Sequence, residues 1–134
     1  MSADDEMLTL ARTMRARAYA PYSKFQVAAV VRGANGKLYG GCNVENAAYP
    51  VGNCAEASAI AAMVGDGETR IVEALVMGPA GELCTPCGAC RQRLREFGPP
   101  ELPILLADPD GIKKTVTLGE LLPMSFGPSH LGKA

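Results

Sequence analysis

Three cysteines in two separate segments constrain this chain more than any other feature of its sequence. Cys54 is followed two positions later by Glu56, and a second segment reads Pro86-Cys87-Gly88-Ala89-Cys90. Cys87 and Cys90 are three positions apart at the start of a predicted helix, so both sulfur atoms can reach one ion. Cys54 begins an earlier predicted helix. The chain must therefore bring two helix N-termini to one metal ion, where their positive ends stabilise thiolates.

The chemistry of these side chains favours a catalytic zinc site. Three cysteine ligands leave the fourth tetrahedral position of Zn²⁺ for water, as catalytic zinc requires. Glu56 can reach that water without being a ligand itself, and it is the predicted general acid/base. Zinc deaminases place ligand-x-Glu on one segment and Pro-Cys-x-x-Cys on another. We therefore predict Cys54, Cys87 and Cys90 as the ligands of one zinc ion per chain.

The cysteine pattern also leaves two other kinds of site open. Cys42 or Cys84 could complete a closed, structural four-cysteine zinc site. The spacing Cys-x-x-Cys-x-x-Cys of Cys84, Cys87 and Cys90 also resembles part of an iron–sulfur cluster motif. That motif has a fourth cysteine followed by proline, and this chain lacks it. We interpret Cys42 and Cys84 as buried thiols or surface residues.

The order of the predicted elements indicates an α/β fold. Helical spacing of apolar residues, β-branched runs and glycine or proline breaks predict four helices separated by strands. The predicted helices are 4–19, 55–64, 88–97 and 118–122, and the predicted strands are 25–32, 37–42, 71–77, 103–107 and 112–116. Strands separated by helices require crossovers, and a sheet with two apolar faces must be covered on both. We expect a three-layer α/β/α sandwich on a five-stranded mixed sheet.

Length and composition limit the classes of protein that fit. With 134 residues, 48% hydrophobic and 20% charged, the chain is expected to form one globular domain spanning 1–134. Its net charge of −1, without a basic run, argues against a nucleic-acid partner. The sequence contains no apolar segment long enough to predict a membrane span. Its N-terminus is acidic, whereas that of a signal peptide is basic. We expect a cytoplasmic protein, where thiols serve as ligands more often than as disulfides.

Five motifs, in order, carry a family resemblance over almost the whole chain. They are Ala20-Pro21-Tyr22-Ser23-Lys24-Phe25, the segment from Gly41 to Tyr49, Cys54-Ala55-Glu56, Pro86-Cys87-Gly88-Ala89-Cys90-Arg91-Gln92, and Leu121-Leu122-Pro123-Met124-Ser125-Phe126. On these motifs the chain resembles the small zinc-dependent cytidine deaminases that form homotetramers.

The resemblance implies roles for residues outside the metal cluster. Asn43 and Glu45 match the ribose-binding pair, and Phe25 matches the aromatic residue that packs on the pyrimidine ring. Ala55 is implied as a further substrate-binding residue. Phe126 matches a tail aromatic that closes the pocket of a neighbouring subunit, and Tyr49 lies in the intersubunit region. The implied partners are a nucleoside substrate and further copies of this chain.

The implied reaction is the hydrolysis of cytidine and 2′-deoxycytidine to uridine and 2′-deoxyuridine, with release of ammonia, as part of pyrimidine salvage. Glu56 would move protons from water to N3 of the ring and then to the departing amine. A modified cytosine nucleoside such as blasticidin S is the alternative substrate. A structural-zinc interaction module is the alternative from a different class of protein.

One position in the metal segment departs from the family pattern. Many relatives carry arginine directly after the catalytic glutamate, where this chain has Ala57. Helix N-termini, backbone N–H groups or Arg91 could offset the negative charge of three thiolates instead. Arg91 and Gln92 could either tie down the metal segment or form helix surface. His130, the only histidine, is expected to be exposed and not a ligand.

Overall fold

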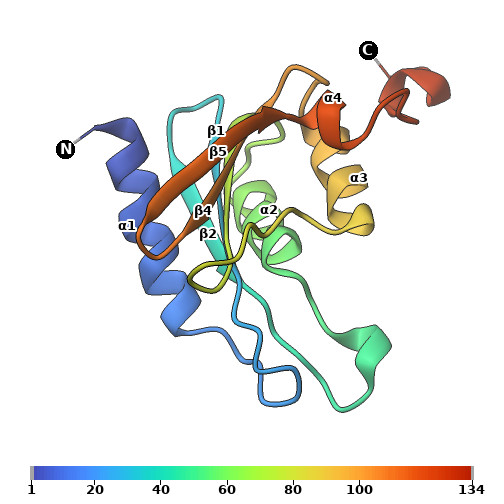
Figure 1. Ribbon diagram of the computed structural model, residues 1–134. Coiled ribbons are helices and arrows are strands. Elements are labelled where there is room, and N and C mark those ends of the chain that lie inside the picture. Colours follow the sequence, from blue (N-terminus) through green and yellow to red (C-terminus); the bar gives the residue numbers. More distant parts are fainter. Residues whose placement is uncertain (1, 134) are drawn as a thin grey trace.

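The computed structural model describes residues 2–133. It contains a five-stranded sheet in the order β2-β1-β3-β4-β5, four α-helices and two short 3₁₀ helices (Figure 1). The strands are β1 (Ala28–Gly33), β2 (Leu38–Cys42), β3 (Ile71–Met77), β4 (Pro103–Asp108) and β5 (Gly111–Thr117). The α-helices are α1 (Ala3–Ala16), α2 (Ala55–Gly65), α3 (Gly88–Phe97) and α4 (Leu118–Leu121), and the 3₁₀ helices are η1 (Tyr49–Val51) and η2 (Pro128–Leu131).

The sheet is mixed because only one neighbouring pair of strands is parallel. β1 and β2 form an antiparallel hairpin, β1 pairs antiparallel with β3, and β4 and β5 form a second hairpin. β3 and β4 run parallel, with Ala74 opposite Ile104. A parallel pair needs a crossover, and here the crossover contains α3. Because the crossover leaves the end of β3 and enters α3, it brings Cys87 to that end of the sheet.

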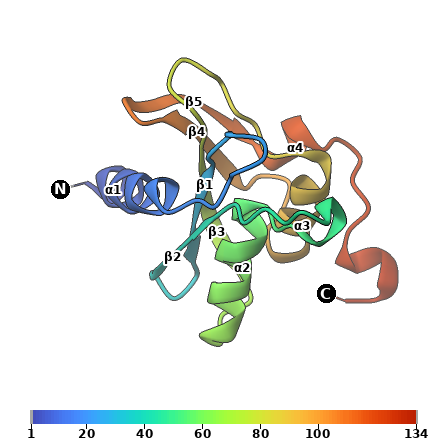
Figure 2. The same cartoon turned by 90° about the horizontal axis from the view of Figure 1, so that it is seen from below.

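Helices cover both faces of the sheet, which confirms the predicted three-layer α/β/α arrangement. Seen from below, α1 lies on one side of the strands, and α2 and α3 lie together on the other (Figure 2). Met7, Leu8 and Ala11 of α1 pack on one apolar face of the sheet. Ala59, Met63 and Leu94 from α2 and α3 are buried in the core on the opposite face. The two helices that carry the predicted metal ligands therefore share a layer.

The docking of α2 explains why its sequence is rich in alanine. A Cβ atom at Gly41 of β2 would lie 2.5 Å from the Ala59 backbone nitrogen and 2.6 Å from the Ala55 carbonyl oxygen. Glycine at this position, with small residues on the facing side of the helix, allows the helix backbone to lie directly against the strand. This close approach sets the position of Cys54, which precedes the first residue of α2.

Most element boundaries agree with the sequence predictions, but the predicted strand 25–32 was wrong at its start. β1 begins only at Ala28. The Val27 N–H donates to the Asn43 side-chain oxygen at 2.9 Å instead of joining the sheet ladder. The predicted helix 4–19 was also too long, because α1 ends at Ala16. The two 3₁₀ helices were not predicted.

The described helices give no sign of a membrane span. None of those formed within residues 2–133 has both the length and the apolar character needed to cross a bilayer.

Candidate metal centre and substrate pocket

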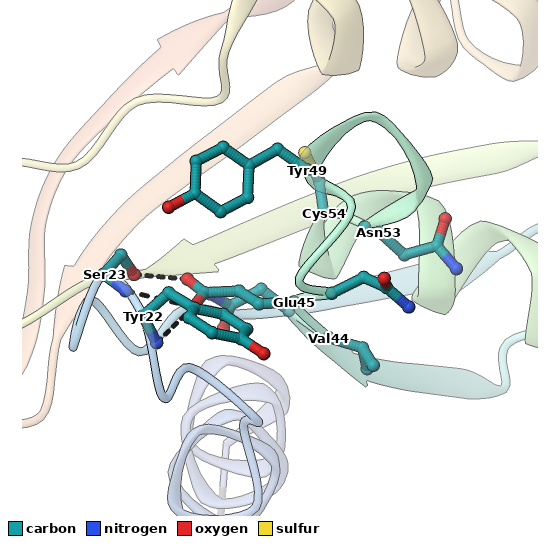
Figure 3. A pocket seen from close by; sticks show the side chains of 10 residues that line it. Tyr22, Ser23, Val44, Glu45, Tyr49, Asn53 and Cys54 are labelled. Atoms are coloured by element: carbon teal, nitrogen blue, oxygen red, sulfur yellow. Dashed lines mark hydrogen bonds between the residues drawn. The ribbon is translucent and has the colours of Figure 1, made fainter.

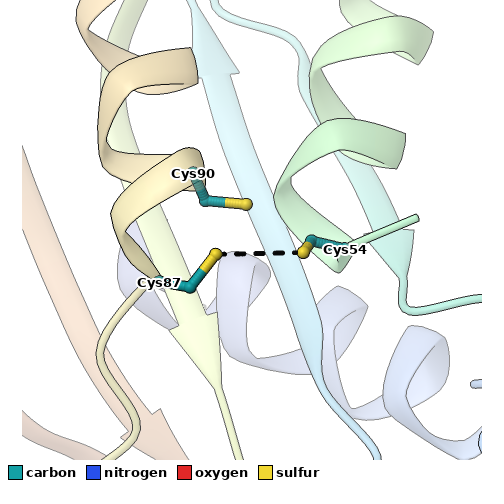
Figure 4. Close-up of side chains that lie close together, drawn as sticks. All are labelled: Cys54, Cys87 and Cys90. Atoms are coloured by element: carbon teal, nitrogen blue, oxygen red, sulfur yellow. Dashed lines mark hydrogen bonds between the residues drawn. The ribbon is translucent and has the colours of Figure 1, made fainter. Parts of the chain in front are cut away.

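The three predicted ligand cysteines lie together where α2 and α3 begin (Figure 4). Cys54 is the N-cap residue of α2, Cys87 is the N-cap residue of α3, and Cys90 lies in the first turn of α3. Their sulfur atoms all lie within 4.8 Å of one another. Neither N-cap side chain bonds to the backbone of its own helix. Both sulfurs can therefore turn toward a shared point between the helices.

The spacing of the sulfur atoms fits a zinc ion. Thiolates at about 2.3 Å from a tetrahedral zinc ion lie roughly 3.8 Å from each other, and Cys54 Sγ lies 3.9 Å from Cys87 Sγ. All five cysteines are free thiols, so no disulfide competes for these sulfurs. Cys42 and Cys84 do not belong to the cluster that the described residues form. Three sulfurs without a fourth leave one coordination position open.

The pKa values of the metal-free thiols differ within the cluster. Burial raises the pKa of Cys54 and of Cys90, and the side chain of Cys90 is fully buried. Burial also acts on Cys87, but the nearby Cys90 N–H and the thiols of Cys90 and Cys54 hold the pKa of Cys87 below its ordinary value. Because a metal ion binds thiolates, metal binding at this cluster would release protons.

Glu56 is the buried acid of the site. Its side chain belongs to the first turn of α2 and its residue is only 4% exposed. Burial raises the pKa of the Glu56 carboxyl, against the opposing effects of its own backbone N–H, the Cys90 thiol and the Arg93 charge. A carboxyl group whose pKa is raised toward neutrality can both accept and return a proton, as a general acid/base must.

A pocket of about 440 Å³ opens beside Cys54 (Figure 3). Two of the predicted substrate-binding residues, Asn43 and Glu45, line it together with Cys54 and Tyr49. Glu45 is held by the loop before β1, since its carboxylate accepts hydrogen bonds from the Tyr22 N–H at 3.0 Å and the Ser23 N–H at 3.1 Å. The Ser23 hydroxyl donates a further short hydrogen bond to it. These bonds lower the pKa of Glu45 and keep it ionised.

Phe25 and Ala55, also predicted to bind substrate, do not line this pocket but adjoin residues that do. The Asn43 side-chain amide donates to the Phe25 carbonyl oxygen at 2.8 Å, so it holds the segment that carries the Phe25 ring. Phe25 is 40% exposed. The Phe25 ring is therefore not fully buried in the core. Ala55 is buried at the start of α2, between Cys54 and Glu56.

Comparison with known proteins assigns the chain to a family. Residues 1–106 match the family described as "Cytidine and deoxycytidylate deaminase zinc-binding region". The chain belongs to the cytidine and deoxycytidylate deaminase family. A protein named cytidine deaminase from Sporosarcina psychrophila is 36% identical over 130 residues, covering 97% of this chain and 96% of that protein. One from Mycobacterium tuberculosis is 39% identical over 116 residues, covering 87% of this chain and 84% of that protein.

Solved structures of this deaminase family share the fold. The crystal structure of cytidine deaminase from Burkholderia pseudomallei has a TM-score of 0.86 and 38% sequence identity to this chain, covering 94% of this chain and all of that one. The crystal structure of cytidine deaminase from Mycobacterium leprae has a TM-score of 0.78 and 40% identity, covering 92% of this chain and 100% of that one. The five-stranded mixed sheet between helical layers is thus the family fold.

Phe126 lies apart from the pocket of its own chain. It follows α4 in the tail and is 56% exposed, and it does not line the pocket formed by the described residues. Its ring stacks on His130 with centroids 4.9 Å apart, and its carbonyl oxygen accepts a hydrogen bond from the Gln92 side chain of α3 at 2.8 Å. His130 is exposed, as expected. Gln92 therefore ties the tail to the helix that carries two of the cysteines.

Two arginines of α3 lie near the metal segment, and only one of them was singled out in the sequence. Arg91 ties down the metal segment: it donates to the carbonyl oxygens of Pro86 at 2.7 Å and Leu121 at 2.8 Å. Sequence reasoning missed Arg93, whose Nη1 donates to Cys90 Sγ at 3.3 Å. The available signal was the spacing, because residues three apart on a helix are neighbours. It also missed Tyr22 and Ser23, which hold Glu45 from a distant part of the sequence.

Proposed function

We propose that this protein is a zinc-dependent deaminase that hydrolyses cytidine and 2′-deoxycytidine to uridine and 2′-deoxyuridine, releasing ammonia. One observation carries the proposal. Three thiols meet within 4.8 Å where two helices begin, directly beside the buried carboxyl of Glu56. The named relatives, which this chain matches over nearly its full length, support the same reaction.

Cys54, Cys87 and Cys90 would hold the zinc ion. Zinc bound by three ligands with one open position supplies a hydroxide nucleophile near neutral pH. The N-termini of α2 and α3 favour the thiolate form of the ligands, because the helix dipoles place partial positive charge there.

Glu56 would transfer the protons of the reaction as a general acid/base. Its carboxylate accepts a proton from the attacking water and delivers it to N3 of the pyrimidine, which makes C4 electrophilic. A C4–O bond then forms. Glu56 takes the remaining proton from the new C4 hydroxyl and gives it to the amine, so that the C4–N bond breaks, C4=O forms and ammonia leaves. Because Glu56 is nearly enclosed by protein, each proton passes between substrate and carboxyl without exchange with bulk water.

The pocket beside Cys54 would bind the nucleoside. Asn43 and Glu45 offer an amide and a carboxylate to the ribose hydroxyls. The half-exposed Phe25 ring offers a face to the pyrimidine, an interaction of about 1–3 kcal/mol per base in other systems. Ala55 lies between the first thiol and the acid, where its backbone borders the ring.

The same proposal extends to assembly and cellular role. We propose that 1–134 act as a single domain, that four copies form a tetramer, and that the enzyme serves pyrimidine salvage in the cytoplasm. Apolar side chains exposed on the single chain support the assembly. Among them are Tyr19, Tyr22, Val44, Tyr49, Val51, Met124, Phe126 and Leu131. In a tetramer Phe126 would close the pocket of a neighbour, since it lies away from its own.

Deamination of cytidine followed by ultraviolet absorbance, with zinc measured on the same sample, tests the proposal. We expect turnover with about one zinc per chain, lost on chelation. Glu56→Gln should keep its zinc and lose turnover by about 100-fold or more, because it removes the general acid/base. Glu101→Gln, which removes an exposed acid between α3 and β4, is the matched control and should keep full activity.

The contradicting outcomes point to the alternatives. Zinc without turnover of cytidine or deoxycytidine, but with turnover of blasticidin S, would move the substrate to a modified cytosine nucleoside. Zinc without turnover of any of the three would indicate a structural metal. Substantial activity in Glu56→Gln would remove Glu56 from its role.

A further inference from the structure

Arg93 contacts the metal cluster through its guanidinium group. It lies one turn beyond Cys90 on α3, and its Nη1 donates to Cys90 Sγ at 3.3 Å. Cys90 is the ligand whose side chain is fully buried, and the surrounding protein withholds water from its sulfur. The guanidinium therefore provides a charged donor to a sulfur atom that solvent cannot reach.

The other arginine close to the cluster cannot do the same. Arg91 uses its guanidinium on the Pro86 and Leu121 carbonyl oxygens and on the Thr85 hydroxyl. Its contacts fix the backbone that carries Cys87, but none of them is to a sulfur. Within residues 2–133, Arg93 is the only basic side chain with a hydrogen bond to one of the three clustered thiols.

The negative charge of the cluster makes a nearby positively charged group favourable. Three thiolates exceed the charge of one divalent cation by one negative unit, and ionised Glu56 adds a second unit in a nearly enclosed position. Charges that are buried together without compensation are costly. A guanidinium bonded to one sulfur withdraws negative charge from that ligand, and charge-assisted hydrogen bonds are stronger than neutral ones.

We propose that Arg93 is a positioning residue of the metal centre: it orients Cys90 and offsets the excess negative charge of the three-thiolate site, so that the chain holds zinc more tightly. It acts through Cys90 and not on the substrate. The inference rests on the proposed zinc function. It identifies the group that offsets the charge of the three thiolates, which the sequence alone left open.

Zinc affinity of the purified full chain tests this inference. Zinc-free protein is titrated with Zn²⁺ in competition with a chromophoric chelator at one pH and ionic strength. We expect Arg93→Gln to weaken zinc binding about tenfold, the effect typical of losing a group that supports a ligand. Arg93→Lys keeps the charge and should stay close to the parent. Arg70→Gln is the matched control. Arg70 lies just before the first residue of β3, whereas the segment with Cys87 and Cys90 comes after the last residue of β3, so the two lie beyond opposite ends of this strand.

The outcomes separate this inference from the proposed function. A parent chain that fails to bind zinc would overturn both. Equal zinc affinity in the parent and Arg93→Gln would overturn the role of Arg93 alone. An equal loss in Arg93→Lys and Arg93→Gln would also overturn it, because the charge would then not matter. A zinc-free Arg93→Gln protein that unfolds at lower denaturant concentration than the parent would indicate an effect on the fold instead.

Discussion

Cys54 and Ala57 lie three positions apart on α2, as Cys90 and Arg93 do on α3. Residues at this spacing share a helix face, so an arginine at position 57 should reach the Cys54 side of the cluster. We therefore predict that Ala57→Arg restores most of the zinc affinity that Arg93→Gln loses. In the parent background the same change should alter zinc affinity only modestly, since Arg93 already supplies the charge. Chelator competition on the double and single variants measures both effects.

Ala57→Gln in the Arg93→Gln background is the control, because it adds a long polar side chain without charge. Recovery by Gln as well as by Arg would contradict an electrostatic rescue. A large gain in affinity from Ala57→Arg alone would show that position 57 limits zinc binding in the natural chain.

The residues that sequence reasoning found are those whose spacing alone brings them together. Cys87 and Cys90 share a helix turn, and Glu56 follows Cys54 by two positions, so their convergence needed only the fold class. Arg91 and Arg93 could not be told apart in this way. Which of them reaches a sulfur depends on the side-chain rotamer and on the path of the chain near Leu121, and neither has a local sequence signal.

At the scale of elements, the contact between α2 and β2 decides where the first cysteine lies. We predict that Gly41→Ala destabilises the protein by about 1–3 kcal/mol, because the added carbon forces apart tightly packed backbones. The atoms it would meet, Ala59 N and Ala55 O, belong to the helix backbone and cannot rotate away. Zinc affinity should fall as well, since the displaced helix carries Cys54. Chemical denaturation and chelator competition measure the two effects.

Gly65→Ala is the matched control on the same helix. A Cβ at Gly65 would meet no atom within 4 Å, and alanine is the better helix former. This variant should be at least as stable as the parent and bind zinc equally well. A Gly41→Ala protein with parental stability would show that the two elements have room to separate.

The turn between β4 and β5 depends on a buried carboxylate. Asp108 is 3% exposed. Burial opposes its ionisation, but the N–H groups of Asp110, Gly81 and Gly111 and the charge of Lys113 hold the pKa of Asp108 below its ordinary value. A depressed folded pKa adds stability above the unfolded pKa of about 3.9, and this stability is lost as the pH falls through the folded pKa.

We therefore predict that Asp108→Asn destabilises the protein most at neutral pH and progressively less below about pH 4, where the aspartate of the unfolded chain becomes protonated first and the native carboxylate follows at its lower pKa. Denaturant unfolding at several pH values measures the difference. Asp110→Asn, which removes an exposed charge from the same turn, is the control. A stability difference between Asp108→Asn and the parent that stays constant with pH would contradict the prediction.

Periodicity predicted the buried elements well and their irregular ends poorly. β3 was predicted with its observed limits, because its last four residues form an apolar run that is buried on both faces of the sheet. The segment from Phe25 to Val27 has strand-like residues, but Asn43 takes its backbone donor and acceptor groups out of the ladder. That interaction joins parts of the chain far apart in sequence, so no local pattern reports it.

At the scale of the whole molecule, the proposed tetramer would make each site depend on two chains. Gln92 and His130 hold Phe126 beside α3, away from the pocket lined by Asn43 and Glu45. If a neighbour's Phe126 closes each pocket, two defective chains can complement each other. Phe126→Ala keeps its own Glu56, and Glu56→Gln keeps its own Phe126.

We predict that each of these variants alone is strongly impaired, and that activity rises when the two are mixed and allowed to exchange subunits. The gain arises because some pockets then combine an intact Glu56 with an intact Phe126 from the neighbour. Ser129→Ala is the matched control, since Ser129 is an exposed polar residue of the same tail and its loss should leave activity near the parent level. Mixing that adds no activity, while native mass spectrometry shows mixed oligomers, would place Phe126 outside the neighbour's site. In that case the tail would serve its own chain, and the exposed apolar side chains would account for assembly alone.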